Sequence, residues 1–264
     1  MTRLRALLMK ELLDLRRNPA TLLPVLLVTV LSFVLPMVIV LIVPAVTGRA
    51  LGTDADLAKV SAIVGEGGGL SQNGRVQLFL FQQFLMLFLL TPITGAMALA
   101  AHAVVGEKQA RTLEPLLATP ITTPELLVAK VLGAVLPTMA ISAIGLALYF
   151  TVISVAAEPG VPRAMAGWRT LVVIFLVGPS AALVALQTAI VISSRVNDAR
   201  TAQQFGVLIV LPLMGLLIAQ FSGSLWLSAG TLALIALGLS GVWVLLVVVS
   251  VAVFDREAIL TRWK

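Results

Sequence analysis

Long apolar runs without a single charged residue recur along the sequence, and they constrain the fold more than any other feature. Each has at least 20 residues and contains no Asp, Glu, Lys or Arg. A helix of that length crosses a hydrocarbon layer of about 30 Å. Continuous rather than alternating apolar character favours helices over a β-barrel. The six predicted spans are residues 20–46, 76–101, 131–157, 170–194, 201–220 and 229–254.

The residue content agrees with a protein that lies mostly in lipid. Only 11% of the 264 residues are charged, whereas soluble domains carry roughly 25%. We therefore expect an all-α membrane protein in which residues 1–264 form a single transmembrane domain. The sequence has no cysteine and one histidine, His102, which excludes thiolate chemistry and His-pair metal motifs. We predict no catalytic residue, metal or cofactor in this chain.

The basic residues predict the orientation in the membrane. With six spans both termini lie on one side. An inside amino terminus puts 13 of the 18 Lys and Arg residues in the cytoplasm and five outside, so both termini are predicted to be cytoplasmic. The longest outer loop is then residues 47–75. The basic residues are scattered over several loops, so we predict no nucleic-acid binding.

The sequence between the last two predicted spans is compatible with two different structures. Residues 201–254 contain no charged residue, and two spans use only about 40 of them. The surplus around residues 219–230 suits a short re-entrant or interfacial helix with Trp226 at the membrane surface. Slightly longer helices joined by a loose turn explain it equally well.

Residues 1–18 are predicted to form an amphipathic helix on the cytoplasmic membrane surface, ended by Pro19. Its polar face carries Arg3, Lys10, Asp14 and Arg17. The apolar stripe consists of Leu4, Leu7, Leu8, Leu12 and Leu15. Such a helix serves either as a simple membrane anchor or as a docking element for a partner.

Residues 106–120 form a short polar segment between two apolar runs, and it contains residues that can begin and end a helix. Thr112 is placed to cap a helix whose first turn holds Glu114 and Pro115, where a carboxylate faces the helix dipole. Pro120 ends this helix after about two turns. The segment is therefore a rigid cytoplasmic helix, which either receives force from a soluble partner or is a plain connecting helix.

The third span is predicted to begin with a second capping motif. Thr123 is expected to cap the helix, with Pro124 and Glu125 in its first turn.

The stretch "GEKQARTLEPLLATPITTPELLVAK" resembles the signature region of the type-2 ABC transporter permeases. In that family the loop between the second and third spans typically reads Gly-Glu-(Lys/Arg)-x-x-x-Thr-(Leu/Ile)-Glu-x-Leu-Leu-x-(Ser/Thr)-Pro-(Val/Ile), followed by a glutamate and Gly/Ala-Lys. The resemblance is closest to the branch of sodium-efflux permeases, although that branch often has a larger outer domain than residues 47–75 supply. The matching residues are Gly106, Glu107, Lys108, Thr112, Leu113, Glu114, Leu116, Leu117, Thr119, Pro120, Ile121, Glu125 and Lys130.

The resemblance implies the transmembrane subunit of an ATP-driven exporter in the bacterial inner membrane, with an architecture like that of type V ABC exporters. Such a permease pairs with a second copy or a related chain and sits on two copies of a separate ABC ATP-binding subunit. That subunit binds the ATP and Mg. Carried over to this sequence, the coupling contacts are Glu107, Lys108, Arg111, Thr112 and Glu114 of the loop helix (residues 106–120), and Arg5, Lys10, Glu11 and Asp14 of the first helix.

Three glutamines inside the predicted spans are the remaining candidates for the substrate pathway: Gln82, Gln83 and Gln187. An amide in lipid seeks a hydrogen-bond partner, so each glutamine either bonds across helices or contacts substrate. Two other functions stay open from the residues alone. The chain could be a secondary transporter, or a membrane scaffold or immunity protein that transports nothing.

Overall fold

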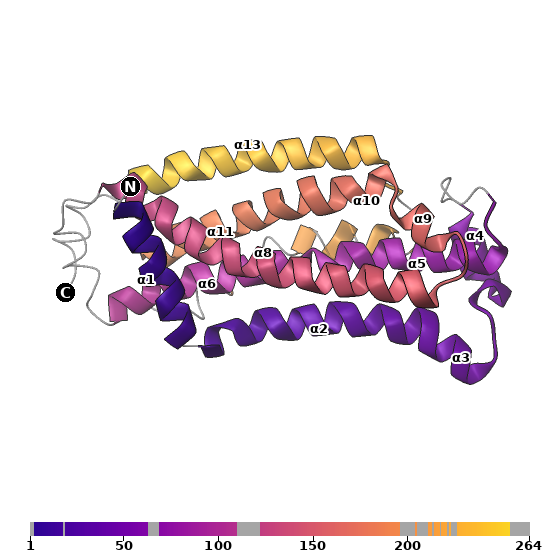
Figure 1. Ribbon diagram of the computed structural model, residues 1–264. Helices are drawn as coiled ribbons and strands as arrows, with labels where there is room; N and C mark the ends of the chain where they lie inside the picture. Colours follow the sequence, from indigo (N-terminus) through magenta and orange to yellow (C-terminus); the bar gives the residue numbers. More distant parts are fainter. Residues whose placement is uncertain are drawn as a thin grey trace.

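The computed structural model describes residues 3–17, 19–62, 69–109, 122–195, 204, 211–212, 214–216, 218–220, 222 and 226–253. Within these ranges all regular secondary structure is helical, which confirms the predicted all-α class. The long helices run side by side in a bundle, and α1 lies across one end (Figure 1). In chain order the elements are α1 (Arg3–Arg17), η1 (Pro19–Leu22), α2 (Leu23–Met37), η2 (Val38–Ile42), α3 (Val43–Thr47), η3 (Leu51–Thr53), α4 (Ala55–Ser61), α5 (Gln72–Phe88), α6 (Leu90–Gln109), α8 (Thr123–Ala156), α9 (Val161–Met165), α10 (Trp168–Val172), η4 (Val173–Val177), α11 (Gly178–Arg195) and α13 (Ala229–Val253).

Among the described residues, five helical stretches are long and apolar enough to cross a membrane. They are Leu23–Thr47, Gln72–Ala103, Pro124–Ala156, Trp168–Ser193 and Ala229–Val251. Each overlaps one predicted span. The remaining prediction, residues 201–220, lies largely outside the described residues, although every described position within it is helical. The count of six spans therefore stays a prediction.

Three of the spans are irregular, and in each case prolines lie close to the irregularity. The helix of the second span breaks at Leu89, between α5 and α6. Pro92 follows three residues later, and its ring clashes with the carbonyl four residues before it. The π-helical turn η4 precedes Pro179 in the same way, and η2 lies between Pro36 and Pro44. The break at Leu89 and the two π-helical turns interrupt the regular α-helical hydrogen bonding of these spans.

The second span forms the centre of the bundle. Leu78, Phe79 and Phe81 of α5 are fully buried, and the hydroxyl of Tyr149 on α8 donates a 2.8 Å hydrogen bond to the Phe81 carbonyl. Helices α2 and α13 lie on opposite flanks of the bundle (Figure 1). The outer face of α13 exposes large apolar side chains such as Leu237. Apolar exposure of this kind is expected of a helix that faces lipid or another membrane chain.

Helices α11 and α13 run in the same direction although they are consecutive among the described spans. Arg169, at the start of the fourth span, contacts Leu227 just before α13. Gln187, late in α11, contacts Ser250, late in α13. The last described residue of α13 thus lies at the end of the bundle that carries α1 (Figure 1).

A carboxylate cluster made of Ser71, Asn73 and Glu158 joins two spans at the opposite end of the bundle. The Glu158 carboxylate accepts hydrogen bonds from the Ser71 hydroxyl at 2.5 Å and from the Asn73 amide at 2.6 Å. The backbone N–H of Glu158 donates to the Gln77 side chain at 3.0 Å. The hydrogen bonds from Asn73 and Ser71 lower the pKa of Glu158 below its ordinary value. The cluster ties the segment after α8 to the first turns of α5.

We expect Glu158→Gln to lower the thermal unfolding midpoint of the detergent-solubilised protein by about 2 °C at pH 7, because an amide accepts these hydrogen bonds less strongly. The folded-state pKa of Glu158 is depressed, so its contribution is present above the unfolded-state pKa. It is lost as the pH falls through the folded-state pKa. The difference between the two proteins should therefore shrink below about pH 4. A difference that stays constant between pH 7 and pH 3 would contradict this assignment.

Candidate functional site

Helix α1 packs one face against the ends of the spans rather than lying free. Leu7 is buried and Leu15 packs against the core, whereas Met9 and Leu13 are exposed. Glu11 lies four residues from each of the two packed leucines and shares their face of the helix. The face turned toward the bundle therefore includes an acidic residue, which the leucine stripe alone does not predict.

A buried ion pair joins α1 to two of the spans. The ammonium group of Lys130, in the second turn of α8, lies 3.3 Å from a carboxylate oxygen of Glu11 and donates a 2.7 Å hydrogen bond to the Ala103 carbonyl of α6. The side chain of Lys130 is completely buried and that of Glu11 is 11% exposed. Taking one charge away from such a pair leaves the other buried and unpaired. Lys130, Glu11 and Ala103 thus define a three-helix junction between α1, α6 and α8.

Gly133 allows the close approach of α1 to α8 at this junction. A Cβ atom at position 133 would lie 2.7 Å from the Cβ of Glu11. Since that atom is the first of the Glu11 side chain, it cannot swing aside as the end of a flexible chain can. The helices could accommodate a larger residue only by moving apart, which would lengthen the ion pair between Glu11 and Lys130.

We predict that Gly133→Ala destabilises the folded protein by about 1–3 kcal/mol, the usual cost of overpacking, despite the better helix propensity of alanine. Gly238→Ala on α13 is the matched control, because a Cβ there meets nothing within 4 Å. Heating of the detergent-solubilised variants followed by size-exclusion chromatography measures the difference. If both variants melt at the same temperature, α1 does not depend on the close contact at Gly133.

The other predicted coupling residues are placed differently. Lys10 lies 3.8 Å from both Glu11 and Asp14, so these three predicted residues form one charged group on α1. The side chain of Arg5 is exposed. Of the loop residues, Glu107 and Lys108 belong to the last turn of α6. Arg111, Thr112 and Glu114, together with most of residues 106–120, lie outside the described residues, so the coupling role of this segment stays a prediction.

The N-cap of helix α8 lies one residue before the predicted cap. Thr122 rather than Thr123 is the N-cap, and it forms a capping box with Glu125. The Thr122 backbone N–H and hydroxyl donate to the Glu125 carboxylate at 2.8 and 2.9 Å, and the Glu125 N–H donates back at 3.4 Å. The capping box needs a three-residue spacing, which places Glu125 at the third helical position. The prediction of Thr123 was wrong because it gave weight to Pro124 instead of this spacing.

A second polar cluster lies at the end of the bundle opposite α1, around Arg169. Arg169 is one of the five basic residues that the predicted topology puts outside, but its side chain is only 3% exposed. Its guanidinium donates to the side-chain oxygens of Gln82 at 2.9 Å and Gln220 at 3.1 Å, and to the Leu227 carbonyl at 3.1 Å. The Trp226 ring lies 4.1 Å from its central carbon. Arg169 on α10 thus links α5 to the segments that lie before and after residues 221–225.

The three predicted glutamines behave in different ways. Gln82 bonds across helices to Arg169, and the amide of Gln187 donates to the Ser250 hydroxyl at 2.6 Å. Gln83 is fully buried, and neither of its side-chain polar atoms has a hydrogen-bond partner within the described part of the chain. Substrate contact by these residues stays a prediction.

The bundle of long apolar helices defines a multi-pass helical membrane protein. In a comparison with protein families, the family model of the ABC-2 family transporter proteins matches residues 5–258. The chain belongs to this family and is a type-2 ABC transporter permease. A search of curated proteins found no match to the sequence.

Proposed function

We propose that this permease is the transmembrane subunit of an ATP-driven exporter in the bacterial inner membrane, with both termini in the cytoplasm. It forms the substrate pathway together with a second permease chain. Two copies of a separate ABC ATP-binding subunit supply the bound ATP and Mg. Membership of the ABC-2 transporter family over nearly the whole chain supports the proposal.

The three-helix junction is the observation that favours coupling at the α1 end of the bundle. Because Lys130 binds Glu11 of α1 and the Ala103 carbonyl of α6, a push on α1 reaches the second and third spans directly. The segment 106–120 connects these same two spans. In the proposed mechanism, ATP-driven closure of the partner subunits moves α1 and this segment together. The spans then rock between inward-open and outward-open arrangements.

We include a sixth span in the proposal. Helix α11 runs toward the α1 end, and α13 begins at the opposite end with the same direction. The chain between them has to return along the bundle, and its described positions between residues 204 and 220 are helical. Gln220 is buried against Arg169 at the far end, as expected at the end of such a span.

Co-purification tests this function most simply. The permease alone is expected to hydrolyse no ATP. When it is co-expressed with a candidate ABC ATP-binding subunit from the same organism, the two should purify together in mild detergent, and the complex should hydrolyse ATP. A permease that never retains this subunit, although both proteins are folded and abundant, would contradict the proposal.

A further inference from the structure

The side of α1 that points away from the bundle carries an apolar pair, Met9 and Leu13. Met9 is two residues from both Leu7 and Glu11. Leu13 is likewise two residues from both Glu11 and Leu15. Since an α-helix turns about 100° per residue, side chains two positions apart lie on opposite sides. Met9 is 55% exposed and Leu13 is 45% exposed, so α1 turns apolar surface outward as well as toward the spans.

Two arginines flank the apolar pair. Arg5 lies four residues before Met9, and Arg16 lies three residues after Leu13, so all four share one side of the helix. Both arginine side chains are exposed, and neither forms an ion pair within the described part of the chain. We call these four residues the outer face of α1. It combines exposed apolar surface with two positive charges.

The outer face lies at the edge of the predicted hydrocarbon layer. The three-helix junction holds α1 at the level of Ala103 and Lys130. Ala103 ends one candidate span, and Lys130 comes one residue before the predicted start of another. Helices α6 and α8 both continue past this level by about 10 Å, at 1.5 Å per residue. Helix α1 therefore packs on their sides (Figure 1), and its outer face is directed sideways at the depth of the lipid head groups.

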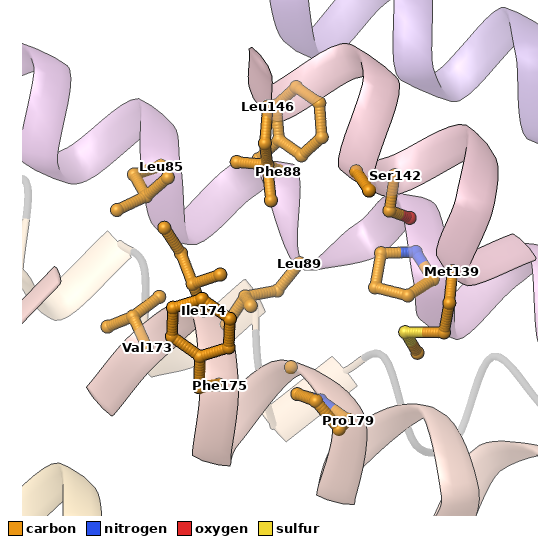
Figure 2. A pocket seen from close by; sticks show the side chains of 13 residues that line it. Leu85, Phe88, Leu89, Met139, Ser142, Leu146, Val173, Ile174, Phe175 and Pro179 are labelled. Carbon is orange, nitrogen blue, oxygen red and sulfur yellow. The ribbon is translucent and has the colours of Figure 1, made fainter. Parts of the chain in front are cut away.

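The flanking charges distinguish this face from other apolar surfaces of the structure. The cavity of about 220 Å³ beside Leu89 and Pro179 has no charged residue in its wall (Figure 2). Helices α2 and α13 contain no charged residue at all. Such surfaces suit hydrocarbon without choosing between lipids. Arg5 and Arg16 give the outer face of α1 a charge that a ligand can match.

A soluble partner is poorly placed to cover this face. A subunit that docks on residues 106–120 meets the ends of α6 and α8, about 10 Å beyond the junction. The predicted coupling residues Lys10 and Asp14 follow Met9 and Leu13 in the sequence, and each lies a little more than a quarter turn away. A partner that contacts Lys10 and Asp14 therefore approaches α1 from another side.

We propose that the outer face of α1 binds anionic phospholipid, with Arg5 and Arg16 at the head-group phosphates and Met9 and Leu13 against the acyl chains. Arginine reaches along apolar surface and keeps its charge in the polar layer, where guanidinium and phosphate form paired hydrogen bonds. The apolar pair is buried at the boundary between head groups and acyl chains. The proposal assigns Arg5, a predicted coupling residue, to lipid. It does not rest on the proposed coupling, because binding is measured on the permease alone.

Photolabelling of the permease in nanodiscs tests this site. The discs are made of phosphatidylcholine with a small fraction of phosphatidylglycerol that carries a diazirine near the head group, or of phosphatidylcholine with the same diazirine. Chymotrypsin, which does not cut at arginine, releases the peptides for mass spectrometry. Within residues 5–16 we expect phosphatidylglycerol to label about five- to thirtyfold more than phosphatidylcholine, the range for one or two basic residues at an anionic surface.

Two double variants separate the site from the overall charge. Arg5→Gln/Arg16→Gln should lower the labelling ratio at least about fivefold, and folding should be unchanged because both side chains are exposed. Arg75→Gln/Arg163→Gln removes the same charge from exposed arginines at the opposite end of the bundle and should leave the ratio unchanged. Three results would overturn the proposal: equal labelling by the two lipids, a ratio that survives Arg5→Gln/Arg16→Gln, or an equal fall in the second variant.

Assembly with the ATP-binding subunit distinguishes lipid from protein as the occupant of this face. In the assembled complex we expect the phosphatidylglycerol labelling of residues 5–16 to persist. Loss of this labelling on assembly would show that the subunit covers the outer face. That result would overturn the lipid assignment while it supports the proposed coupling, so the two proposals can fail separately.

Discussion

Replacing Lys130 by methionine should destabilise the folded protein by about 3–5 kcal/mol, the usual effect of removing one partner of a buried ion pair. The side chain of Lys130 is completely buried, and its charge faces the Glu11 carboxylate at 3.3 Å. Without it, Glu11 keeps Lys10 of its own helix as a charged neighbour at 3.8 Å but loses its ionic contact with α8, so α1 detaches from α8 more readily. Thermal unfolding in detergent measures the loss. Cleavage within α1 by a protease should become faster in the same variant.

The double variant Glu11→Gln/Lys130→Met separates the ion pair from general packing. With both charges gone, no charge remains buried alone, so most of the lost stability should return. Lys59→Met is the matched control, because Lys59 pairs with Asp56 in an exposed position, where such a pair contributes about 0–1 kcal/mol. A Lys130→Met protein as stable as the Lys59→Met protein would show that the junction does not hold α1.

Removing both acidic side chains of the predicted coupling segment, with Glu107→Ala/Glu114→Ala, should reduce ATP-driven export at least about tenfold, as expected when a charged contact worth 1.4 kcal/mol or more is lost. Insertion and folding should be unchanged, because neither residue belongs to a predicted span. Export from proteoliposomes that contain the complete complex, together with ATP hydrolysis, measures the effect. We expect hydrolysis to continue while export falls.

Asp56→Ala is the control for this double variant, since Asp56 is an exposed acid on α4, at the opposite end of the bundle. It should export at the wild-type rate. Normal export by the Glu107→Ala/Glu114→Ala protein would show that these glutamates do not transmit the motion of the ATP-binding subunit. The family assignment would not be affected by that result.

The positions of the spans could be predicted from the sequence because lipid tolerates neither charge nor unpaired backbone. The ends of the helices could not be predicted, because the length of an apolar run does not show whether the helix continues into the polar sequence next to it. Helix α8 begins at Thr123, eight residues before the predicted span, since the capping box at Thr122 starts the helix in polar sequence. Helix α6 likewise continues through Gln109, into the segment predicted to be the coupling loop.

The contacts of Glu11 and Arg169 could not be predicted from the sequence, for a different reason. A list of charged residues predicts which side of the membrane they occupy, but burial depends on which helices meet. Glu11 was predicted to contact a partner protein, and in the structure its carboxylate lies against Lys130. One signal was available: Glu11 is spaced four residues from Leu7 and from Leu15, so it shares their packed face. For Arg169 the partners Gln82 and Gln220 are 87 and 51 residues away in the chain, and no local pattern reveals them.

Cross-linking from a single cysteine tests most directly whether an ATP-binding subunit docks on the α1 end of this permease. The sequence contains no cysteine, so a Glu114→Cys variant carries one thiol for a photoreactive maleimide. In the assembled complex we expect it to cross-link to the ATP-binding subunit, and an Asp56→Cys variant at the opposite end should not. Absence of the cross-link from position 114, in a complex that still exports at the full ATP-driven rate, would contradict the account.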